Sequence, residues 1–321
     1  MKFFTLEDKL PHEACVATIG FFDGVHKGHR FLIRQVDRLA AERSLSSLLI
    51  TFRAHPREAL HADYLPQLLT TYEEKCAWLA TTGADACVTL DFTPELAAMS
   101  ARSFMSDILK GKLNVRCLII GYDHRFGHDR SEGFEDYVAY GREMGIEVIR
   151  AEAFSMGGVH VSSSMVRACL AEGEAGMAAR CLGRPYELSG RVVAGFHVGH
   201  ELGYPTANLA VGDVRKLVPG GGVYAVWVKD AAEPGGRLWK GMLNIGCRPT
   251  LENGDARSIE VYLLDFEGNL YGHRLAVAFV ARLRDERKFR NKGELAHQLR
   301  EDEECVRRIL SGTDPAGVQD L

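Results

Sequence analysis

The sequence predicts an α/β domain followed by a second domain that is a small β-barrel. In the first half, apolar runs of strand length alternate with amphipathic segments of helical length. From Pro185 onward, short strands are instead separated by Gly, Pro, Asn and Asp. Strand–helix alternation is typical of a parallel sheet covered on both faces, whereas evenly spaced short strands favour an antiparallel barrel. The 321 residues are enough for two separate cores.

The first buried strand is expected at 15–19, and an amphipathic helix at 30–41. Between them lies the stretch Gly-Phe-Phe-Asp-Gly-Val-His-Lys-Gly-His at 20–29. Glycines let backbone approach a ligand closely, and the N-terminus of a helix presents free N–H groups, which suits a polyphosphate. His26 and His29 are three residues apart and can donate hydrogen bonds to neighbouring phosphate oxygens. Two surface histidines beside a turn are the plain alternative.

The other elements of the first domain complete the alternation. Further strands are expected at 47–52, 86–90, 115–120 and 146–149, and helices at 70–82, 94–109 and 134–144. Ligands of such sheets bind beyond the carboxyl ends of the strands. The stretch 20–29 and the loop 121–127 both follow strands, so they are expected on the same rim of the sheet.

A serine-rich stretch precedes the end of this domain. Ser163 or Ser164 is predicted to cap a helix, and Arg167 lies one turn inside it. Hydroxyls, free N–H groups and a guanidinium could then converge on one phosphate. The alternative is an ordinary serine cap beside a surface arginine. Helices are expected through 165–182, with the domain boundary near Gly183.

The second domain is expected to contain five recognisable strands and a terminal helix. The strands are predicted at 186–193, 222–228, 238–245, 259–264 and 275–280, and the charged helix at 292–310. The helix is expected to end at Gly312, with a mobile polar tail after it.

A second glycine-punctuated loop lies inside this domain, at 195–208. Its glycines are Gly195, Gly199 and Gly203. Pro205 stiffens the turn that presents Thr206 and Asn208, whose side-chain oxygens are ligands that Mg²⁺ accepts beside substrate phosphates. An irregular hairpin without a ligand is the alternative.

Glu260 is the other polar residue that the pattern singles out. By the two-residue period of a strand, it faces away from Ile259 and Val261 and shares its face with Tyr262. A carboxylate in this position is either a solvated outward residue or a general base.

Composition argues against several classes of function. The formal net charge of −4 lacks the basic excess of a nucleic-acid binder, so nucleic acid is not expected as a partner. No apolar run approaches the roughly 18 residues of a membrane span, and a cytoplasmic location is expected. The eight cysteines form no C-x-x-C pair, which predicts neither a zinc site nor a disulfide framework. Most are expected to be buried thiols.

Several motifs together, in this order and spacing, resemble the prokaryotic bifunctional riboflavin kinase/FAD synthetase family. The resemblance covers nearly the whole chain and rests on the stretches 20–29, 121–127, 161–167, 183–186, 202–208, 244–250, 271–272 and 283–289. It implies a Rossmann-like nucleotidyltransferase domain with FMN adenylyltransferase activity at 1–183. A riboflavin kinase barrel at 184–312 and a tail at 313–321 follow.

The resemblance also implies roles for individual residues. In the adenylyltransferase, ATP would be bound by Gly20, Phe21, Phe22, Asp23, Gly24, His26, Gly28, His29, Ser163, Ser164 and Arg167, and the flavin by Asp123, Arg125 and Phe126. In the kinase, ATP would be bound by Gly195, Gly199, Gly203, Pro205, Thr206 and Asn208, with Mg²⁺ on Thr206 and Asn208. The catalytic residues would be Glu260, as base, with Asn208, and His26 with His29 in the other domain.

At four positions the sequence departs from what the family often has. The family often carries Asn at Phe21, Phe at His124, Arg at His200 and His at Tyr262. None of these departures removes a residue to which chemistry is assigned, although two of them lie beside the kinase site.

The implied function is ATP-dependent phosphorylation of riboflavin to FMN, followed by adenylylation of FMN to FAD. ATP, riboflavin, FMN and FAD would be its substrates and products, with Mg²⁺ as cofactor and no membrane partner, and the protein would be a monomer or weak homo-oligomer. One alternative is a nucleotidyltransferase for another small phosphate substrate, such as pantetheine phosphate. The other is a flavin-binding regulatory protein without turnover.

Overall fold

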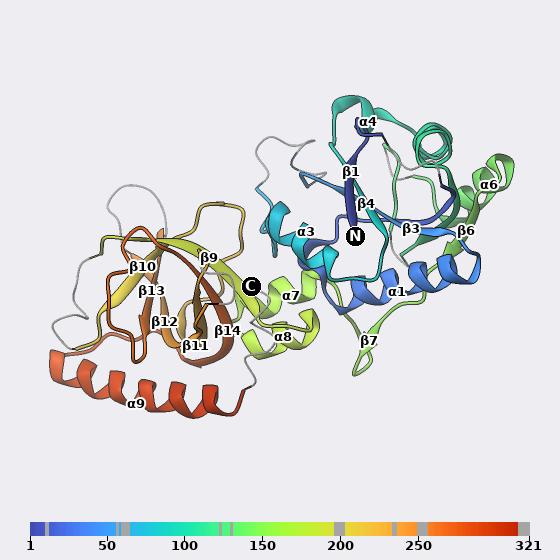
Figure 1. Cartoon of the computed structure of the whole chain (residues 1–321). Coiled ribbons are helices and arrows are strands. Elements are labelled where there is room, and N and C mark those ends of the chain that lie inside the picture. Colours follow the sequence, from blue (N-terminus) through green and yellow to red (C-terminus); the bar gives the residue numbers. More distant parts are fainter. Residues whose placement is uncertain are drawn as a thin grey trace. The chain divides into compact units, whose positions relative to one another are not determined.

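In the computed structural model, the chain divides into two compact units, Met1–Ser163 and Ser164–Leu321. Figure 1 shows the helices and strands of both units. The structure describes residues 1–9, 13–55, 58, 65–121, 124–128, 131–195, 203–232, 236–248 and 256–313.

The first unit alternates strands and helices as predicted. Its strands are β1 (Lys2–Thr5), β2 (Cys15–Ile19), β3 (Ser46–Phe52), β4 (Ala86–Leu90), β5 (Val115–Ile120), β6 (Glu147–Arg150) and the short pair β7 (Ser155–Met156) and β8 (Val159–His160). Its helices are η1 (Asp23–Val25), α1 (Lys27–Glu42), α3 (Tyr72–Ala80), α4 (Pro94–Ala98), α5 (Ala101–Ser103), η2 (Phe104–Lys112) and α6 (Phe134–Met144). The strands β1, β7 and β8 were not predicted.

Six of these strands form one parallel sheet in the order β1-β4-β3-β2-β5-β6. Apolar residues fill both of its faces: Ala17 and Ile50 belong to one buried cluster, and Val16 and Leu49 to clusters on the opposite face. The predicted parallel sheet with two covered faces is therefore confirmed. From β2 the chain first moves one way through β3 and β4, then crosses back to β5, which creates a switch point beside β2.

The predicted single helix at 94–109 is wrong, because the chain breaks at Met99. Met99 has extended backbone (ψ 133°), and its carbonyl accepts a hydrogen bond from the His128 amide at 3.0 Å, outside any helix. Ser100 then starts a new helix, its hydroxyl accepting from the Ser103 amide at 3.1 Å. A serine favours such a cap more than a position inside a helix.

The second unit is a closed antiparallel barrel with helices attached. The strands are β9 (Tyr186–Val193), β10 (Thr206–Ala210), β11 (Gly222–Asp230), β12 (Trp239–Arg248), β13 (Ala256–Leu263) and β14 (Arg274–Arg284), and they close in the order β10-β13-β12-β11-β14-β9. The barrel and the five predicted strands are confirmed. The sixth, β10, was read from the sequence as part of a loop.

Helix α9 (Lys292–Ser311) covers part of the barrel's outer wall (Figure 1). Its Val306 and Leu310 pack against Val223 and Trp227 of β11. Strand residues that point to the other side of the wall, such as Val261, are also fully buried. The barrel therefore carries apolar residues on both sides of its wall.

Helices α7 (Ser163–Ala171) and α8 (Ala175–Leu182) lie between the sheet and the barrel in sequence. Helix α8 packs on β9 and β14, and the Gly220 amide donates to the Leu170 carbonyl of α7 at 2.8 Å. These contacts put α8 and most of α7 in the compact unit of the barrel. The functional boundary at 183 stays a prediction.

Among the described residues, no helix combines the length and the apolar character that a membrane crossing requires. Among the cysteines whose side chains the structure describes, the free thiols are Cys15, Cys76, Cys87, Cys117, Cys169, Cys181 and Cys305. Four of these, Cys15, Cys87, Cys117 and Cys181, are buried.

Candidate functional site

The stretch 20–29, called the nucleotide loop below, leaves the carboxyl end of β2 at the switch point of the sheet. Two residues of this loop with side chains have positive φ, Phe22 at 56° and Val25 at 40°. Such backbone is strained for a β-branched residue and persists only where the surroundings fix it. Strain of this kind is found preferentially at ligand sites, which supports the predicted function of the loop.

Asp23 supplies part of that fixation. Its carboxylate is buried and accepts hydrogen bonds from the amides of Leu69 and Thr70, each at 3.0 Å, and from the Thr70 hydroxyl at 3.1 Å. The Thr70 hydroxyl also accepts from the Gly24 amide at 3.0 Å. The observed contacts of the Asp23 carboxylate thus fasten the loop, and its predicted contact with ATP stays a prediction.

The structure brings His26 and His29 together. Their rings stack with centroids 3.6 Å apart and planes 20° apart. His26 is the N-cap of α1, and its Nδ1 accepts from the His29 amide at 3.3 Å. With Nδ1 as acceptor, a neutral His26 carries its proton on Nε2. The pair therefore presents imidazole groups at the N-terminus of a helix, where anions are favoured.

Gly28 explains how the loop closes against the end of this unit. A Cβ at Gly28 would lie 2.8 Å from the Val161 carbonyl oxygen and 3.0 Å from the His26 ring, so no larger residue fits without displacement. Ser163 donates from its hydroxyl to the Asp23 carbonyl at 2.9 Å. Helix α7 begins at Ser163, so the cap falls one residue before the two predicted serines.

Ser164 and Arg167 belong to the second compact unit, in which α7 continues. Their convergence with the histidines on one triphosphate stays a prediction. Within the first unit, the nucleotide loop is joined to Ser163 by the hydrogen bond to Asp23. This part of the predicted site therefore lies in one compact unit.

The predicted flavin residues follow β5. Asp123 lies outside the described residues, and Arg125 is exposed. Phe126 is buried, and its ring stacks on Tyr137 at 4.2 Å while its amide donates to the Tyr137 hydroxyl at 3.1 Å. This packing makes Phe126 part of the core that supports the loop. Its contact with flavin stays a prediction.

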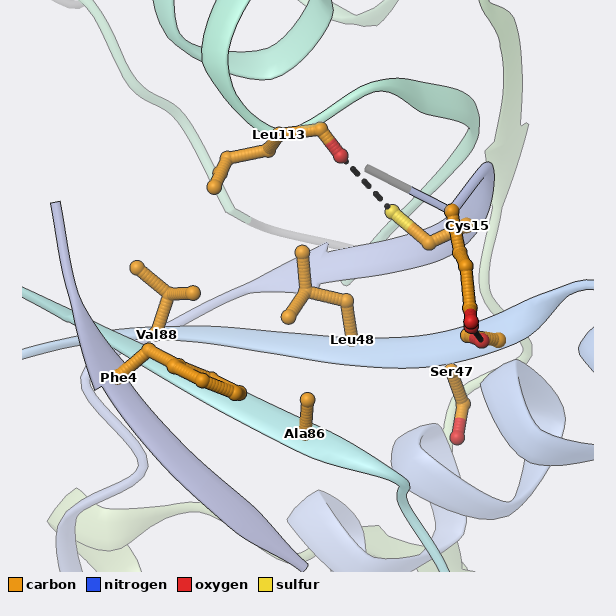
Figure 2. A pocket seen from close by; sticks show the side chains of 9 residues that line it. Phe4, Cys15, Ser47, Leu48, Ala86, Val88 and Leu113 are labelled. Carbon is orange, nitrogen blue, oxygen red and sulfur yellow. Dashed lines mark hydrogen bonds between the residues drawn. The ribbon is translucent and has the colours of Figure 1, made fainter. Parts of the chain in front are cut away.

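A small cavity lies at the other end of the same sheet, at the amino ends of β2, β3 and β4 (Figure 2). Its volume of about 30 Å³ is enough for one or two water molecules. Cys15 lines it, and its thiol donates to the Leu113 carbonyl at 3.3 Å. Burial raises the pKa of Cys15 to about 12, so its thiolate is not available as a nucleophile at neutral pH. Since the nucleotide loop leaves the opposite, carboxyl end of the sheet, this cavity is separate from the predicted ATP site.

In the barrel, three polar residues form a row across neighbouring strands. Asn208 of β10 pairs with Glu260 of β13, and Glu260 pairs with Asn244 of β12. Directly paired residues in antiparallel strands point to the same face, so the carboxylate lies between two amides on the outer wall. Glu260 faces away from the buried Val261, as predicted.

Thr206 lies two residues before Asn208 on the same face of β10, where it pairs with Tyr262. Its hydroxyl donates to Glu260 Oε2 at 3.3 Å. Asn208 is buried, and a Cβ at Gly195 would lie 2.0 Å from its Nδ2, so glycine is required where the chain passes over the amide. Thr206 and Asn208 are thus strand residues, which corrects their predicted position in a loop.

A pocket of about 240 Å³ opens above the row. Its walls are Tyr204, Thr206, Val223, Met242, Asn244, Glu260, Tyr262, Arg284, Glu286, Arg287, Phe289, Leu295, Leu299 and Asp302. Burial, reinforced by the Glu303 carboxylate, raises the pKa of Tyr204 to about 12 and also raises that of Tyr262. Both tyrosines therefore stay neutral at physiological pH and give the pocket aromatic walls. Gly203 and Pro205 flank Tyr204, and Gly199 lies outside the described residues.

An ion pair fixes the far wall of this pocket and was not predicted. Arg284 donates to Asp302 of α9 through Nε and Nη2, the latter at 2.7 Å, and its guanidinium lies 5.8 Å from the Phe289 ring centroid. Asp302 interrupts the apolar stripe of α9 between Leu299 and Val306. A lone carboxylate on an apolar helix stripe was the available signal in the sequence. Its partner, Arg284, lies on strand β14 and could not be identified from that stripe.

The oxygen donors of this site fit a magnesium ion better than a transition metal. No group of three or more His, Cys, Asp or Glu gathers as a metal centre in the described part of the chain. Thr206, Asn208 and Glu260 offer only oxygen ligands within one strand pair. Mg²⁺ is commonly held by few protein oxygens together with substrate phosphates.

Both halves of the chain match known protein families. A model of FAD synthetase matches residues 8–165, and a model of riboflavin kinase matches residues 182–310. The protein named bifunctional riboflavin kinase/FMN adenylyltransferase from Escherichia coli K12 is 38% identical over 306 residues, covering 95% of this chain and 96% of that protein. The protein of the same name from Pseudomonas fluorescens is 37% identical over 300 residues and covers 94% of both chains.

A solved structure from Streptococcus pneumoniae, described as a macrolide-efflux protein, has the same fold. It superposes with a TM-score of 0.85 at 30% identity and covers 96% of this chain and 99% of that one. Similarity in sequence and in structure therefore extends over both units.

Proposed function

Because this chain belongs to the bifunctional riboflavin kinase/FMN adenylyltransferase family, we propose that its two reactions are divided between the nucleotide loop and the polar row of the barrel. The enzyme phosphorylates riboflavin with ATP to give FMN, and adenylylates FMN with a second ATP to give FAD and pyrophosphate. The observation that carries the division is the row Asn208, Glu260 and Asn244, which puts a carboxylate inside a pocket on the barrel.

In the kinase step, Glu260 takes the proton of the riboflavin 5′-hydroxyl. The freed oxygen attacks the γ-phosphorus of ATP, and the bond from that phosphorus to the ADP oxygen breaks. An alcohol must lose this proton during attack, so a positioned base accelerates the step. The hydrogen bond from Thr206 orients the carboxylate, and the amide of Asn208 flanks it.

Thr206 and Asn208 are the residues that would hold Mg²⁺ in this proposal. When bound, the ion would neutralise phosphate charge on ATP. The buried amide of Asn208 under Gly195 and the hydroxyl of Thr206 are held in place by the strand, which supports this assignment.

In the adenylyl transfer, an FMN phosphate oxygen attacks the α-phosphorus of ATP and pyrophosphate leaves. The nucleophile is already anionic near neutral pH, so a base adds little. Stabilisation of charge is what the step requires. The Nε2–H of His26, the neighbouring His29 and the N-terminus of α1 supply it, and Ser163, Ser164 and Arg167 are proposed to bind the same triphosphate.

The relatives named above argue against the two alternative functions, since both family models match and the barrel retains a carboxylate in its pocket. We also propose a cytoplasmic location and a monomer or weak homo-oligomer. The domain assignment 1–183 and 184–312 belongs to the same proposal.

Product analysis tests the proposal. The protein is incubated with riboflavin, ATP and Mg²⁺, and samples are separated by chromatography over time. FMN is expected first and FAD after it. Thr206→Ala is expected to raise the Mg²⁺ concentration needed for half-maximal FMN formation, whereas Thr206→Ser, which keeps the hydroxyl, is expected to leave it near the wild-type value. Unchanged Mg²⁺ dependence in Thr206→Ala would contradict the metal assignment.

A further inference from the structure

A buried lysine lies beneath the nucleotide loop and has no part in the chemistry described so far. Lys75, on α3, is only 2% exposed. Its ammonium group donates to the carbonyl of Phe52, the last residue of β3, at 2.6 Å. That carbonyl is at the carboxyl end of the sheet, the same rim from which the nucleotide loop leaves β2.

Two aromatic rings also lie close to this ammonium. Nζ lies 4.1 Å from the centroid of the Phe21 ring in the loop and 5.6 Å from that of Tyr72. Arg53 lies over the same Tyr72 ring at 4.6 Å, and His55 meets the Phe21 ring edge-on at 4.9 Å. The contact of Lys75 with Phe21 is a desolvated cation–π interaction, which is stronger than one exposed to water.

No carboxylate forms an ion pair with Lys75 among the residues that the structure describes. Burying an ammonium without such a partner costs free energy, and a methionine of similar size would avoid that cost. A buried charge at this position is therefore poorly explained by stability. A cluster of this kind beside an anion site is a candidate for function.

Two side chains of opposite charge, those of Lys75 and Asp23, fasten the nucleotide loop. The Asp23 carboxylate fastens η1 to the residues that precede α3, and the Lys75 ammonium fastens Phe21 and the end of β3 to α3 itself. Helix α3 begins with a capping box between Thr71 and Glu74, which fixes its N-terminus. The loop is thus clamped to one well-defined helix end.

We propose that Lys75 is a positioning residue of the adenylyl transfer, which holds Phe21 and the nucleotide loop in the conformation that binds ATP and places a positive charge under the phosphates. This inference rests on the proposed ATP site at the nucleotide loop. Lys75 acts through Phe21 and through its charge, without forming a bond to a reacting atom.

The charge of Lys75 can be switched by pH. Burial lowers the pKa of Lys75 to about 8, although the negative charge of the Asp23 carboxylate opposes the shift. Among the groups packed around it, burial raises the pKa of Tyr72 and of Cys76, and raises that of Cys87 to about 12. These three groups stay neutral near pH 8, so a loss of activity in this range is expected to report the lysine.

The test measures FAD formation from supplied FMN and ATP across about pH 6.5 to 9.5, a range that spans the change of charge on Lys75. The wild type is expected to lose kcat/KM for ATP as the pH rises through about 8, because Lys75 becomes neutral. Lys75→Met is expected to be lower by about tenfold at pH 7 and to lack this alkaline loss. Lys75→Arg keeps a positive charge at all these pH values, so it is expected to show no alkaline loss either.

Three further measurements keep the outcomes distinct. FMN formation from riboflavin, which uses the barrel, is expected to be unchanged in both variants. The midpoint of thermal unfolding of Lys75→Met shows whether the variant is folded at the assay temperature, and a loss of FAD formation in the folded variant is the expected result. His29→Ala tests the ATP site itself: if it leaves FAD formation intact, the proposed site is wrong, whatever Lys75 does.

The inference about Lys75 would be overturned if Lys75→Met kept the wild-type kcat/KM and alkaline loss while His29→Ala was inactive. If Lys75→Met fails to fold, the pH profile of Lys75→Arg decides the matter: an alkaline loss identical to that of the wild type would exclude Lys75 as its source.

Discussion

The two sites of this enzyme are built in opposite ways. The proposed adenylyltransferase site is a strained loop at the rim of a parallel sheet, with two stacked imidazoles at a helix N-terminus and a buried ammonium against the loop. The proposed kinase site is a row of side chains on the outer wall of a closed barrel, in which a carboxylate lies between two amides. One site gathers positive charge and N–H groups, and the other presents a proton acceptor.

The difference follows from the nucleophiles. The phosphate of FMN is ionised before it reacts, so the site only has to bind and stabilise charge. The hydroxyl of riboflavin has to lose a proton, so its site needs a base such as Glu260. Glu260→Gln, His29→Ala and Asp23→Asn each change one site and leave the other as a control.

The largest effect is expected for Glu260→Gln. FMN formation from riboflavin should fall by about a hundredfold to ten-thousandfold, because the amide cannot accept the proton. FAD formation from supplied FMN should not change. Glu267→Gln, at an exposed position of the same unit, serves as the matched control. If Glu260→Gln formed FMN at nearly the wild-type rate, Glu260 would not be the general base.

His29→Ala is expected to lower the rate at the other site by about a hundredfold, which is the size of effect found when one preorganised hydrogen-bond donor is removed. FAD formation from FMN should fall, whereas FMN formation should persist. His128→Ala changes an exposed histidine of the same unit and should leave both rates intact. Equal loss of both activities in His29→Ala would mean damaged folding or coupled sites.

A smaller effect is expected for Asp23→Asn, which weakens the attachment of the nucleotide loop. The amide has only one acceptor oxygen for the donors of Leu69 and Thr70. The free energy of unfolding should fall by about 1–3 kcal/mol, and FAD formation by about tenfold. Urea unfolding and the rate from supplied FMN measure the two effects. A lower rate without lower stability would instead indicate a direct contact of Asp23 with ATP.

The smallest effect is expected for Asp230→Asn, at a position of the barrel outside the kinase pocket. Burial opposes the ionisation of Asp230, but hydrogen bonds from His273 Nδ1 at 2.6 Å and the Ala232 amide at 3.0 Å lower its pKa overall. The contribution to stability is thus present above the ordinary value of 3.8 and is lost as the pH falls through the lowered pKa.

The variant should lose about 1 kcal/mol at pH 7, with less difference from the wild type in strong acid. Thermal unfolding at several pH values measures this. Both activities should stay at the wild-type level; a selective loss of FMN formation would mean that the barrel site extends to this pair.

Local signals in the sequence were enough to predict the elements with simple periodicity. The bounds of β2, β4, β5, β9 and α6 were predicted to the residue. The helix broken at Met99 was not, because one serine cap and a tertiary hydrogen bond from His128 outweigh helical propensity. Strand β10 was missed because its Thr206 and Asn208 are polar and follow Pro205, and only pairing with β13 makes them a strand.

The candidate sites show the same limit. His26, His29 and Glu260 stand out in the sequence, since each belongs to a motif or interrupts a pattern within a few residues. Lys75 does not, because its partners Phe52 and Phe21 come from two other segments of the chain. Contacts between distant segments define these roles, and no single stretch of sequence contains them.

The position of the kinase site on the outside of the barrel has a consequence for how this half can change. In a closed barrel every strand has two neighbours, so the spacing of Asn208, Glu260 and Asn244 is set by hydrogen bonds that ring the whole wall. The opposite side of the pocket is a separate helix, α9, which contributes Leu295, Leu299 and Asp302. The proposed reaction chemistry and the shape of the pocket thus depend on different elements. Substitutions in α9 can change the shape of the pocket while the polar row on the strands is preserved.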